Sequence, residues 1–406
     1  MNKLNVVLRT LPALLFICSG LTSAAPSRYF TYDAATLAQT RSRVAEKNSP
    51  LLPAYQALLT AADKALQEPV LSVAQKTLLP ASGDKHDYYS FGPYWWPNPD
   101  TASHLPYIRK DGKTNPDSKT DATDSTRLVR FGDDMRVLGL AYYFSGNRAY
   151  AVKTAEMARA WFINRQTLMN PNMAYAQAIP GIVEGRGIGI IDSRVLIDVM
   201  DSIELIRPAD TLSEADYQAI KRWYGTFSQW LLTSDNGFEE SNWHNNHGAF
   251  YDAQVVAFSL FSDHPDVAKQ QMRVAMLRHL TAQIDRQGYL TAETERTRSW
   301  HYTQFALSAF QRLARYGELT GVDLWNSAID DHKLEQALTI PARFIDKQAE
   351  WPFPELKFEP QEALGNLLAA TRAYPKNALF REKAQQMSVA YPDNINLLTT
   401  TAPLVR

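Results

Sequence analysis

The sequence predicts an all-α fold, and three observations lead to this prediction. Apolar residues recur at spacings of three and four along most of the 406-residue chain, which is the period of an amphipathic helix. The alternation typical of half-buried strands is scarce. The glycine-rich segment Gly185 to Gly189 (GRGIG) follows no convincing strand and lacks the third glycine of a dinucleotide-binding turn. A helical chain is therefore favoured over an α/β fold.

Helical periodicity divides the chain into many segments of ordinary helix length. Helices are predicted at 54–67, 133–144, 149–163, 191–206, 214–232, 248–262, 266–285, 300–320, 335–346, 360–373 and 378–390. Ser213 followed by Asp216 three residues later resembles a helix start. So many helices in one chain favour stacked antiparallel helical hairpins. Long connections remain at 75–130, 166–189 and 233–247, and structureless loops of that length are uncommon unless they are functional or disordered.

The first connection contains an unusually aromatic segment, Asp87 to Asp100 (DYYSFGPYWWPNPD). It is too aromatic for disorder and too rich in proline and glycine for a helix, so we expect an ordered flap over residues 86–99 or a groove wall. The rings that could stack on sugars are Tyr88, Tyr89, Tyr94, Trp95 and Trp96. Burial in the core is the alternative for these rings. Arg109 could bind an anionic sugar, or it could belong to a solvated turn before Asp111.

Residues 1–25 have the pattern of an export signal. Lys3 and Arg9 precede a short apolar run, Leu11 to Cys18, and small residues follow at Ser23 to Ala25. This apolar run is shorter than the roughly 20 residues that span a membrane. We therefore expect a periplasmic or secreted protein whose residues 26–406 form one catalytic domain. A lipoprotein anchored at Cys18 is the alternative, although the bulky Ile17 before it argues against that.

Composition excludes several classes of function. Cys18 is the single cysteine, so cleavage of the signal removes thiol catalysis and cysteine-bound zinc. Cleavage also leaves 40 basic against 43 acidic residues, a net charge of −3 with neutral histidine. That balance argues against binding of nucleic acid through bulk positive charge. Cations that hold an anionic substrate would have to be local.

Two short segments carry side chains suited to chemistry. The first is Ser241 to Gly248 (SNWHNNHG), where Asn246 and His247 could face a cavity from the start of a helix. Its alternatives are an elaborate helix cap, or a zinc site at His244 and His247 for which no carboxylate stands at helical spacing. The second is Glu293 to Tyr302 (ETERTRSWHY). It could be an ion-paired turn, or a tyrosine whose pKa a neighbouring cation lowers enough for proton exchange.

These segments, in this order on a helical chain, resemble the alginate lyase superfamily, which covers polysaccharide lyase families five and thirty-eight. The aromatic segment, with Leu105 to Gly112 after it, is closer to family thirty-eight, and the resemblance spans roughly residues 50 to 375. It implies an (α/α) toroid, an incomplete barrel of helical hairpins with a groove across the helix ends.

The resemblance also implies which residues form the site. Asn246 and His247 match its Asn-His pair, and Tyr302 matches its catalytic tyrosine. Seven residues before that tyrosine, where family five has arginine, this chain has Glu295. A slip of one residue selects Arg296 as the arginine, with Arg298 as the fallback. Arg298 and His301 are otherwise expected to bind substrate.

Such a site would cleave a uronic-acid polymer by β-elimination. Arg296 and Asn246 would neutralise the carboxylate, because an ionised carboxylate leaves the C5 proton very weakly acidic. Tyr302 could serve as base and acid when the C5 proton and the C4 oxygen share one face of the ring, as in mannuronate or glucuronate. In guluronate they lie on opposite faces, and His247 could then be the base. No metal or organic cofactor is required.

Two other functions remain open at this point. A helical-toroid glycoside hydrolase would need two suitably spaced carboxylates, and Glu239, Glu240, Glu293 and Glu295 are available. An exported carbohydrate-binding protein without catalysis would explain the aromatic residues but not the two polar segments together. The preferred uronate, internal or terminal cleavage, and the oligomeric state are not determined by the sequence.

Overall fold

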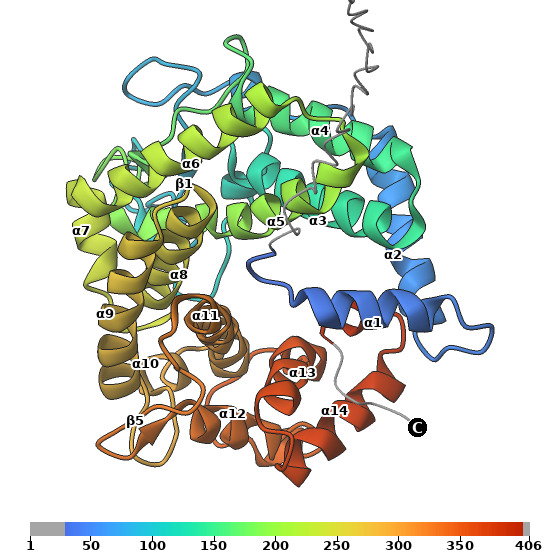
Figure 1. Ribbon diagram of the computed structural model, residues 1–406. Coiled ribbons are helices and arrows are strands. Elements are labelled where there is room, and N and C mark those ends of the chain that lie inside the picture. The colour runs from blue at the N-terminus through green and yellow to red at the C-terminus, as the bar shows by residue number, and fades with distance from the viewer. Residues whose placement is uncertain (1–28, 401–406) are drawn as a thin grey trace, which may run out of the picture.

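A computed structural model describes residues 29–400 and shows a ring of antiparallel helices (Figure 1). The predicted signal peptide, residues 1–25, lies outside the described residues. The main helices are α1 (Ala34–Val44), α2 (Leu52–Gln67), α3 (Ser125–Ser145), α4 (Arg148–Phe162), α5 (Leu196–Ile206), α6 (Glu214–Thr233), α7 (Asp235–Ser241), α8 (Asn246–Phe261), α9 (Pro265–Gln283), α10 (Thr291–Thr294), α11 (Ser299–Thr320), α12 (Leu334–Ala342), α13 (Leu364–Ala373), α14 (Ala378–Ala390) and α15 (Asn396–Thr399).

The helices form an inner and an outer layer. The inner helices α3, α5, α8, α11 and α13 contact one another in that order around the ring. Outer helices cover them: α2 and α4 pack on α3, α6 and α9 on α8, and α12 and α14 on α13. Contacts of α15 with α1 and α2 join the two ends of the arc. The predicted (α/α) toroid is confirmed, and it does not form a closed barrel.

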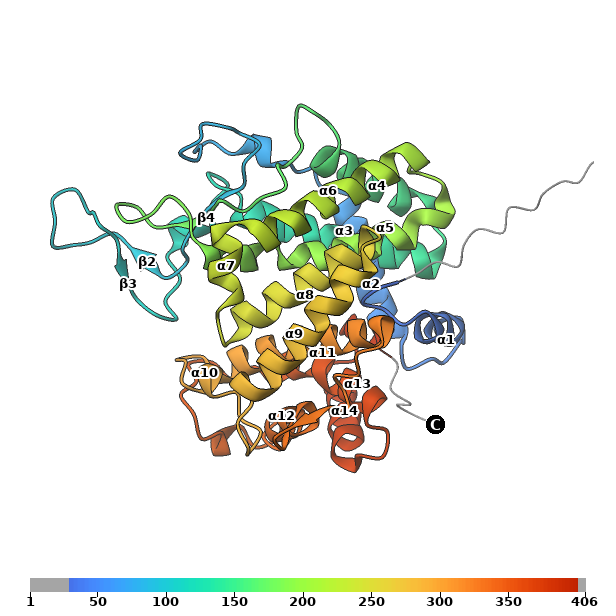
Figure 2. The ribbon, with the colours of Figure 1, turned by 60° about the vertical axis from the view of Figure 1, so that its left-hand side comes forward.

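Short strands occur only in pairs within the described residues. They are β1 (Tyr89–Phe91), β2 (Trp95–Trp96), β3 (Ile108–Arg109), β4 (Tyr175–Ala178), β5 (Ala328–Ile329) and β6 (His332–Lys333). Strands β1 and β4 pair in parallel, while β2 pairs antiparallel with β3 so that Trp95 lies opposite Arg109. Figure 2 shows the β2–β3 hairpin projecting from one end of the helical ring. The predicted flap, residues 86–99, is thus ordered, and it continues through β3 to Gly112.

Most of the predicted helices are present, with shifts at their ends. Ser213 and Asp216 form the expected capping box at the start of α6. Helix α1 was missed because its buried positions include Thr36 and Thr40, which hide the apolar period. The predicted connection 233–247 was wrong in part, since it contains α7. This helix is only seven residues long, and its Phe238 is 73% exposed.

The predicted helix 191–206 was also wrong in part, because a 3₁₀ helix, η3 (Gly187–Val195), precedes α5. The glycines of the GRGIG segment allow η3 to lie directly against β4. A Cβ atom on Gly185 would lie 2.0 Å from the carbonyl oxygen of Ala174, and one on Gly189 would lie 2.5 Å from Cβ of Ala176. These glycines therefore serve close backbone packing.

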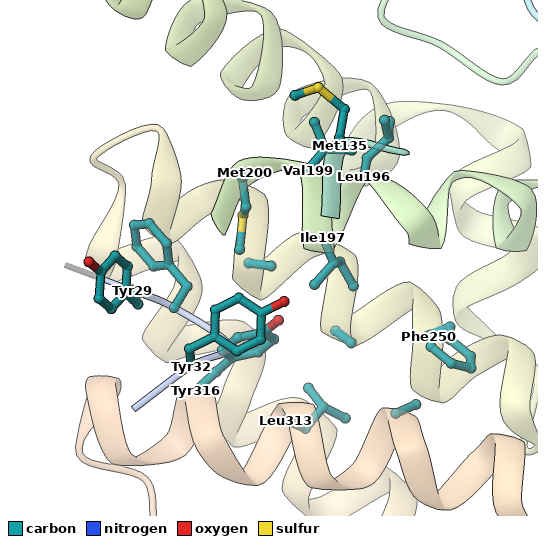
Figure 3. Close-up of a cluster of buried hydrophobic side chains, with 14 of the residues drawn as sticks. Tyr29, Tyr32, Met135, Leu196, Ile197, Val199, Met200, Phe250, Leu313 and Tyr316 are labelled. Carbon is teal, nitrogen blue, oxygen red and sulfur yellow. The ribbon is translucent and has the colours of Figure 1, made fainter. Parts of the chain in front are cut away.

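The hydrophobic core lies between the two helical layers as well as between the inner helices, and the N-terminal segment packs against it. Figure 3 shows a cluster of buried side chains from α3, α5, α8, α11 and the N-terminal segment, among them Tyr29, Tyr32, Met135, Leu196, Ile197, Val199, Met200, Phe250, Leu313 and Tyr316. Asp201 of α5 anchors the N-terminal segment, because its two carboxylate oxygens accept from the backbone N–H groups of Phe30 and Thr31, each at 2.7 Å.

A second buried carboxylate of α5, Glu204, generates a prediction about pH. Burial raises the pKa of Glu204 to about 7, although its side chain accepts a 2.6 Å hydrogen bond from Tyr217. Because the folded pKa lies above the ordinary value of about 4.3, the folded state gains from the proton. That stabilisation is fully present below about pH 4 and is lost as pH rises through about 7.

Glu204→Gln should keep the acceptor for Tyr217 and remove the titration. Relative to wild type, the variant should gain about 2–3 kcal/mol of unfolding free energy between pH 5 and pH 8. Urea unfolding at the two pH values measures this difference. An equal stability difference at both values would show that Glu204 does not titrate in this range.

Candidate active site

The segments that precede the inner helices meet at one end of the ring. Asn246 at the start of α8 bonds Glu293 of α10, so segments 241–248 and 293–302 lie together, as the resemblance implies. The flap joins them, because Asp111 pairs with Arg296. The backbone of the flap also bonds the segment before η3, since the N–H of Tyr107 donates to the carbonyl of Pro180. Helix N-termini gathered in this way favour a bound anion.

Asn246 is held by a buried carboxylate. One Glu293 oxygen accepts from the backbone N–H of Asn246 at 2.5 Å, and both oxygens lie 3.0 Å from its amide nitrogen. Asn246 is 1% exposed, and its Oδ1 has no hydrogen-bond partner within the described residues. Burial raises the pKa of Glu293, while the bonds from Asn246 oppose that shift. Glu293 therefore fixes the orientation of the amide.

Fifteen of the sixteen residues of α8 are buried, and His247 is the exception. Asn245 caps the helix by accepting from the backbone N–H of His247. The ring nitrogen Nδ1 lies 3.0 Å from Oε1 of Glu240, a fully buried residue of α7. Burial raises the pKa of Glu240, and the bond with His247 opposes the shift. With Nδ1 engaged in this way, Nε2 is the nitrogen left for a substrate.

Tyr302 lies beneath the flap on the first turn of α11. Its hydroxyl is 2.6 Å from that of Tyr94, and the guanidinium of Arg296 stands 3.8 Å from its ring centroid. The neighbouring cation acts in the direction expected from the sequence, but it does not lower the pKa of Tyr302 overall. Burial raises the pKa of Tyr302, Tyr94 adds to the shift, and Arg296 opposes it only in part. The free enzyme therefore keeps Tyr302 protonated.

The Asp111–Gly112 turn fixes the flap over this site. Asp111 accepts from Arg296 at 3.1 Å and from Arg109 at 2.8 Å. Gly112 has a φ of +71°, and a Cβ atom there would lie 2.4 Å from Oγ1 of Thr297. Arg296 is thus paired with Asp111 and not with a glutamate of its own segment, as an ion-paired turn would require. Arg109 itself lies at the surface, with 59% of its side chain exposed.

The aromatic candidates of the flap have different surroundings. Trp95 and Trp96 are partly exposed and face cations, since the guanidinium of Arg186 is 5.9 Å from one ring and the ammonium of Lys110 is 5.1 Å from the other. Tyr89 is also partly exposed. Tyr88 is fully buried.

The burial of Tyr88 corrects its assignment as a sugar-binding residue. Its hydroxyl donates to Asp192, so no face of its ring is open to a sugar. The neighbouring residue Tyr89 begins β1 and lies on the more open side.

His301 and Arg298 lie at the edge of the site, beside the segment that leads into α13. The ring nitrogen Nδ1 of His301 is 2.6 Å from Glu362, and its ring stacks on Phe305. Arg298 precedes the first turn of α11, and its backbone pairs with that of Glu355. Both side chains are partly exposed.

Sequence reasoning missed the supporting carboxylates. Glu240 and Glu293 were considered as acids of a hydrolase, and Asp111 only as part of a turn. The separation of Asn246 from Glu293 is 47 residues, and that of Asp111 from Arg296 is 185. No local pattern reveals pairs so far apart. A hint was available in the density of hydrogen-bonding groups at Asn246 and His247, which need buried partners.

The sequence and the fold of this chain are also similar to those of known proteins. The profile of the alginate lyase family matches residues 72–351. No curated protein matches the chain. The crystal structure of an alginate lyase from Bacteroides ovatus is 34% identical, has a TM-score of 0.87, and covers 92% of this chain and 99% of its own.

Two structures of a more distant enzyme share the fold. Alginate lyase A1-III from Sphingomonas species A1 is 14% identical with a TM-score of 0.54, covering 87% of this chain and 96% of its own. A His-to-Ala variant of A1-III in complex with a tetrasaccharide gives the same identity and TM-score, with coverage of 88% and 97%.

The bond between His247 and Glu240 predicts which ring nitrogen carries the proton. An ionised Glu240 accepts the Nδ1 proton, which leaves Nε2 unprotonated in the neutral ring. In ¹⁵N NMR spectra, neutral His247 should show a protonated Nδ1 in the wild type, and this preference should be lost in Glu240→Ala. His264 at the start of α9 is a suitable reference because its Nδ1 lies 3.1 Å from the hydroxyl of Ser262 and not from a carboxylate. A wild-type His247 protonated at Nε2 would contradict the assignment.

Proposed function

Because the chain belongs to the alginate lyase family, we propose that it cleaves alginate or a related 1,4-linked uronan such as glucuronan at Tyr302. The protein is a polysaccharide lyase, and β-elimination with an unsaturated uronate end is the reaction that this class performs. The observation that carries the proposal is the meeting of Tyr302, Arg296 and Tyr94 beside the Asn246–His247 start of α8.

The first requirement of the reaction is a neutralised carboxylate. Arg296 suits this role because its fork meets a carboxylate with two bonds and keeps its charge. In the free enzyme Asp111 holds that fork, so the uronate carboxylate would take the place of Asp111. An Nε2 atom without a proton cannot donate to a carboxylate, so His247 would meet the uronate through Nε2 only when both of its ring nitrogens are protonated. Asn246 would have to release one of its two amide bonds to Glu293 before it could donate to that carboxylate. Glu240 and Glu293 hold these two side chains in position.

The second requirement is proton transfer from C5 to the leaving oxygen. Tyr302 takes the C5 proton as phenolate, the C4–O4 bond breaks, and a double bond forms between C4 and C5. The phenol then gives the proton to O4, so the enzyme ends in its starting state. Arg296 beside the ring is placed to stabilise the phenolate. The hydroxyl of Tyr94 at 2.6 Å would do so only as the donor of the bond to Tyr302. For guluronate, His247 would act as the base on the other face.

The flap would supply the sugar-binding surface. Tyr89, Tyr94, Trp95 and Trp96 are partly exposed, and ring faces of this kind pack against sugars. Arg109, Arg298 and His301 would contact carboxylates of neighbouring sugars. Tyr88 is left out of this surface because it is fully buried. Its bond to Asp192 supports the wall behind the flap.

The arrangement of the glutamates does not favour the hydrolase alternative. A glycosidase needs two carboxyl groups that face a sugar from opposite sides. Here Glu293 is bound to Asn246, and Glu240 is bound to His247. Each is buried as the partner of another side chain, which is the position of a supporting group rather than a catalytic acid.

We also propose that the enzyme is exported after removal of residues 1–25 and acts in the periplasm or outside the cell. The basic, apolar and small-residue regions of that segment support the proposal. A helix long and apolar enough to cross a bilayer is not found between residues 29 and 400.

Tyr302→Phe tests the proposed chemistry. The change removes one oxygen, so turnover should fall by ~10²–10⁴-fold, the usual loss for a general acid–base group. Turnover is measured as ultraviolet-absorbing product from polymannuronate, polyguluronate and glucuronan. Affinity for uronate oligosaccharides should change much less. Tyr391→Phe, at the end of α14, is the matched control and should keep wild-type turnover. Near-normal elimination by Tyr302→Phe would contradict the mechanism.

The raised pKa of Tyr302 adds a prediction about pH. Because burial favours the protonated phenol, only a small fraction is phenolate at neutral pH. The wild-type kcat/KM should therefore rise about tenfold per pH unit on the alkaline side, until the fold is lost. A profile that falls above neutral pH while the protein remains folded would show that Tyr302 phenolate is not the base.

A further inference from the structure

Arg194 is a partly buried cation that none of the site assignments uses. It stands at the end of η3, and its guanidinium lies 5.0 Å from the ring centroid of Phe305. Phe305 is three residues after Tyr302 on α11, which is about one helical turn. Its ring stacks on His301 and lies 4.5 Å from that of Phe250. The rings of Phe305 and Phe250 form an aromatic floor next to the proposed catalytic residues, and Arg194 stands over it.

The floor connects both sides of the proposed site. Phe250 follows His247 by three residues on α8, as Phe305 follows Tyr302 on α11. The two rings thus lie one turn beneath the two groups that we propose to meet the uronate. Phe305 is partly exposed whereas Phe250 is buried, so the open face of the floor is on the side of Phe305 and Arg194.

The hydrogen-bonding capacity of Arg194 is largely unused. Its Nη1 donates to the carbonyl of Ile191 at 3.0 Å, and within residues 29–400 no further hydrogen bond or ion pair involves its guanidinium. Arg312 of α11, by contrast, forms a bidentate pair with Asp198 at 2.8 and 3.1 Å.

The carboxylate with the largest favourable effect on Arg194 is Asp192, but its oxygens are bonded elsewhere. One accepts from the hydroxyls of Tyr88 and Ser90, and the other accepts from Gln177. Burial lowers the pKa of Arg194, as expected for a cation that has lost water without gaining a partner. Arginine nevertheless stays charged in proteins. A carboxylate delivered by a ligand would supply the missing partner.

We propose that Arg194 forms a subsite for the carboxylate of the uronate adjacent to the sugar that is cleaved. This inference rests on the proposed function, because it places a second anionic sugar beside the Tyr302 site. The planar guanidinium offers Nε and Nη2 in the geometry that binds a carboxylate bidentately. Phe305 supports the guanidinium from below and limits where the sugar lies.

The subsite has a consequence for substrate choice. A polymer with uronates at consecutive positions would place one carboxylate at Arg296 and the next at Arg194. A polymer in which neutral sugars alternate with uronates would leave Arg194 desolvated and unpaired, and this costs binding energy. The enzyme should therefore prefer consecutive uronates, and much of this preference should depend on a single side chain.

The experiment compares wild type with Arg194→Met, Arg194→Lys and the control Arg222→Met. Arg222 is an exposed residue of the outer helix α6. The probes are polymannuronate and the same polymer after partial reduction of its carboxyl groups, assayed by ultraviolet-absorbing product. Arg194→Met should raise KM for polymannuronate at least about tenfold, as for loss of a charge-assisted bond, with a smaller change in kcat. The preference for the unreduced polymer should shrink.

Arg194→Lys keeps the positive charge but cannot form two parallel bonds to a carboxylate. Its KM should therefore lie between that of wild type and that of Arg194→Met. If Arg194→Met does not fold, the Lys variant tests the subsite, which predicts a KM above that of wild type together with a wild-type Tm. Wild-type KM and substrate preference in both Arg194 variants would overturn the subsite. An equal loss on both polymers together with a lowered Tm would assign Arg194 a purely structural role. A wild-type enzyme that produces no unsaturated product from any uronan would instead refute the proposed function.

Discussion

The interaction on which the site depends is the pairing of two buried carboxylates with the first turn of α8. Glu293 bonds both the backbone and the amide of Asn246, and Glu240 bonds His247. Buried carboxylates are costly unless they are hydrogen-bonded. Their positions on α10 and α7 therefore fix how these elements pack around α8, a helix that is buried except at His247. The arrangement holds the partly exposed imidazole of His247 next to the buried amide of Asn246 at the start of α8.

The flap completes the site from the other direction through contacts that a substrate can replace. Asp111 occupies Arg296 with a carboxylate, the same group that a uronate would bring. The hydroxyl of Tyr94 forms a hydrogen bond with the hydroxyl of Tyr302. In this structure both side chains are thus covered, which accounts for the burial and the raised pKa of Tyr302. When an acidic sugar binds, its carboxylate would replace that of Asp111. Arg296 would therefore have a carboxylate partner both before and after binding.

Local periodicity was sufficient to predict most of the helices, although it missed α1 and α7. The resemblance of short motifs predicted that Asn246, His247 and Tyr302 share one site. The sequence could not show which side of the flap each aromatic ring faces. Tyr88 and Tyr89 are neighbours, yet one is buried behind β1 and the other is partly exposed. The answer depends on how β1 lies against β4, which no local pattern encodes. The pKa of Tyr302 was misjudged for a similar reason, because desolvation beneath the flap outweighs the nearby cation.

The central claim is that a uronate lies between Tyr302 and the start of α8. The crystal structure of Tyr302→Phe with a bound uronate tetrasaccharide tests it most directly. The account predicts C5 and O4 of one sugar at the ring edge of residue 302, with the carboxylate of that sugar between Arg296 and His247 and with Asp111 released from Arg296. A tetrasaccharide bound away from residue 302, or one whose carboxylate points away from both Arg296 and His247, would contradict it.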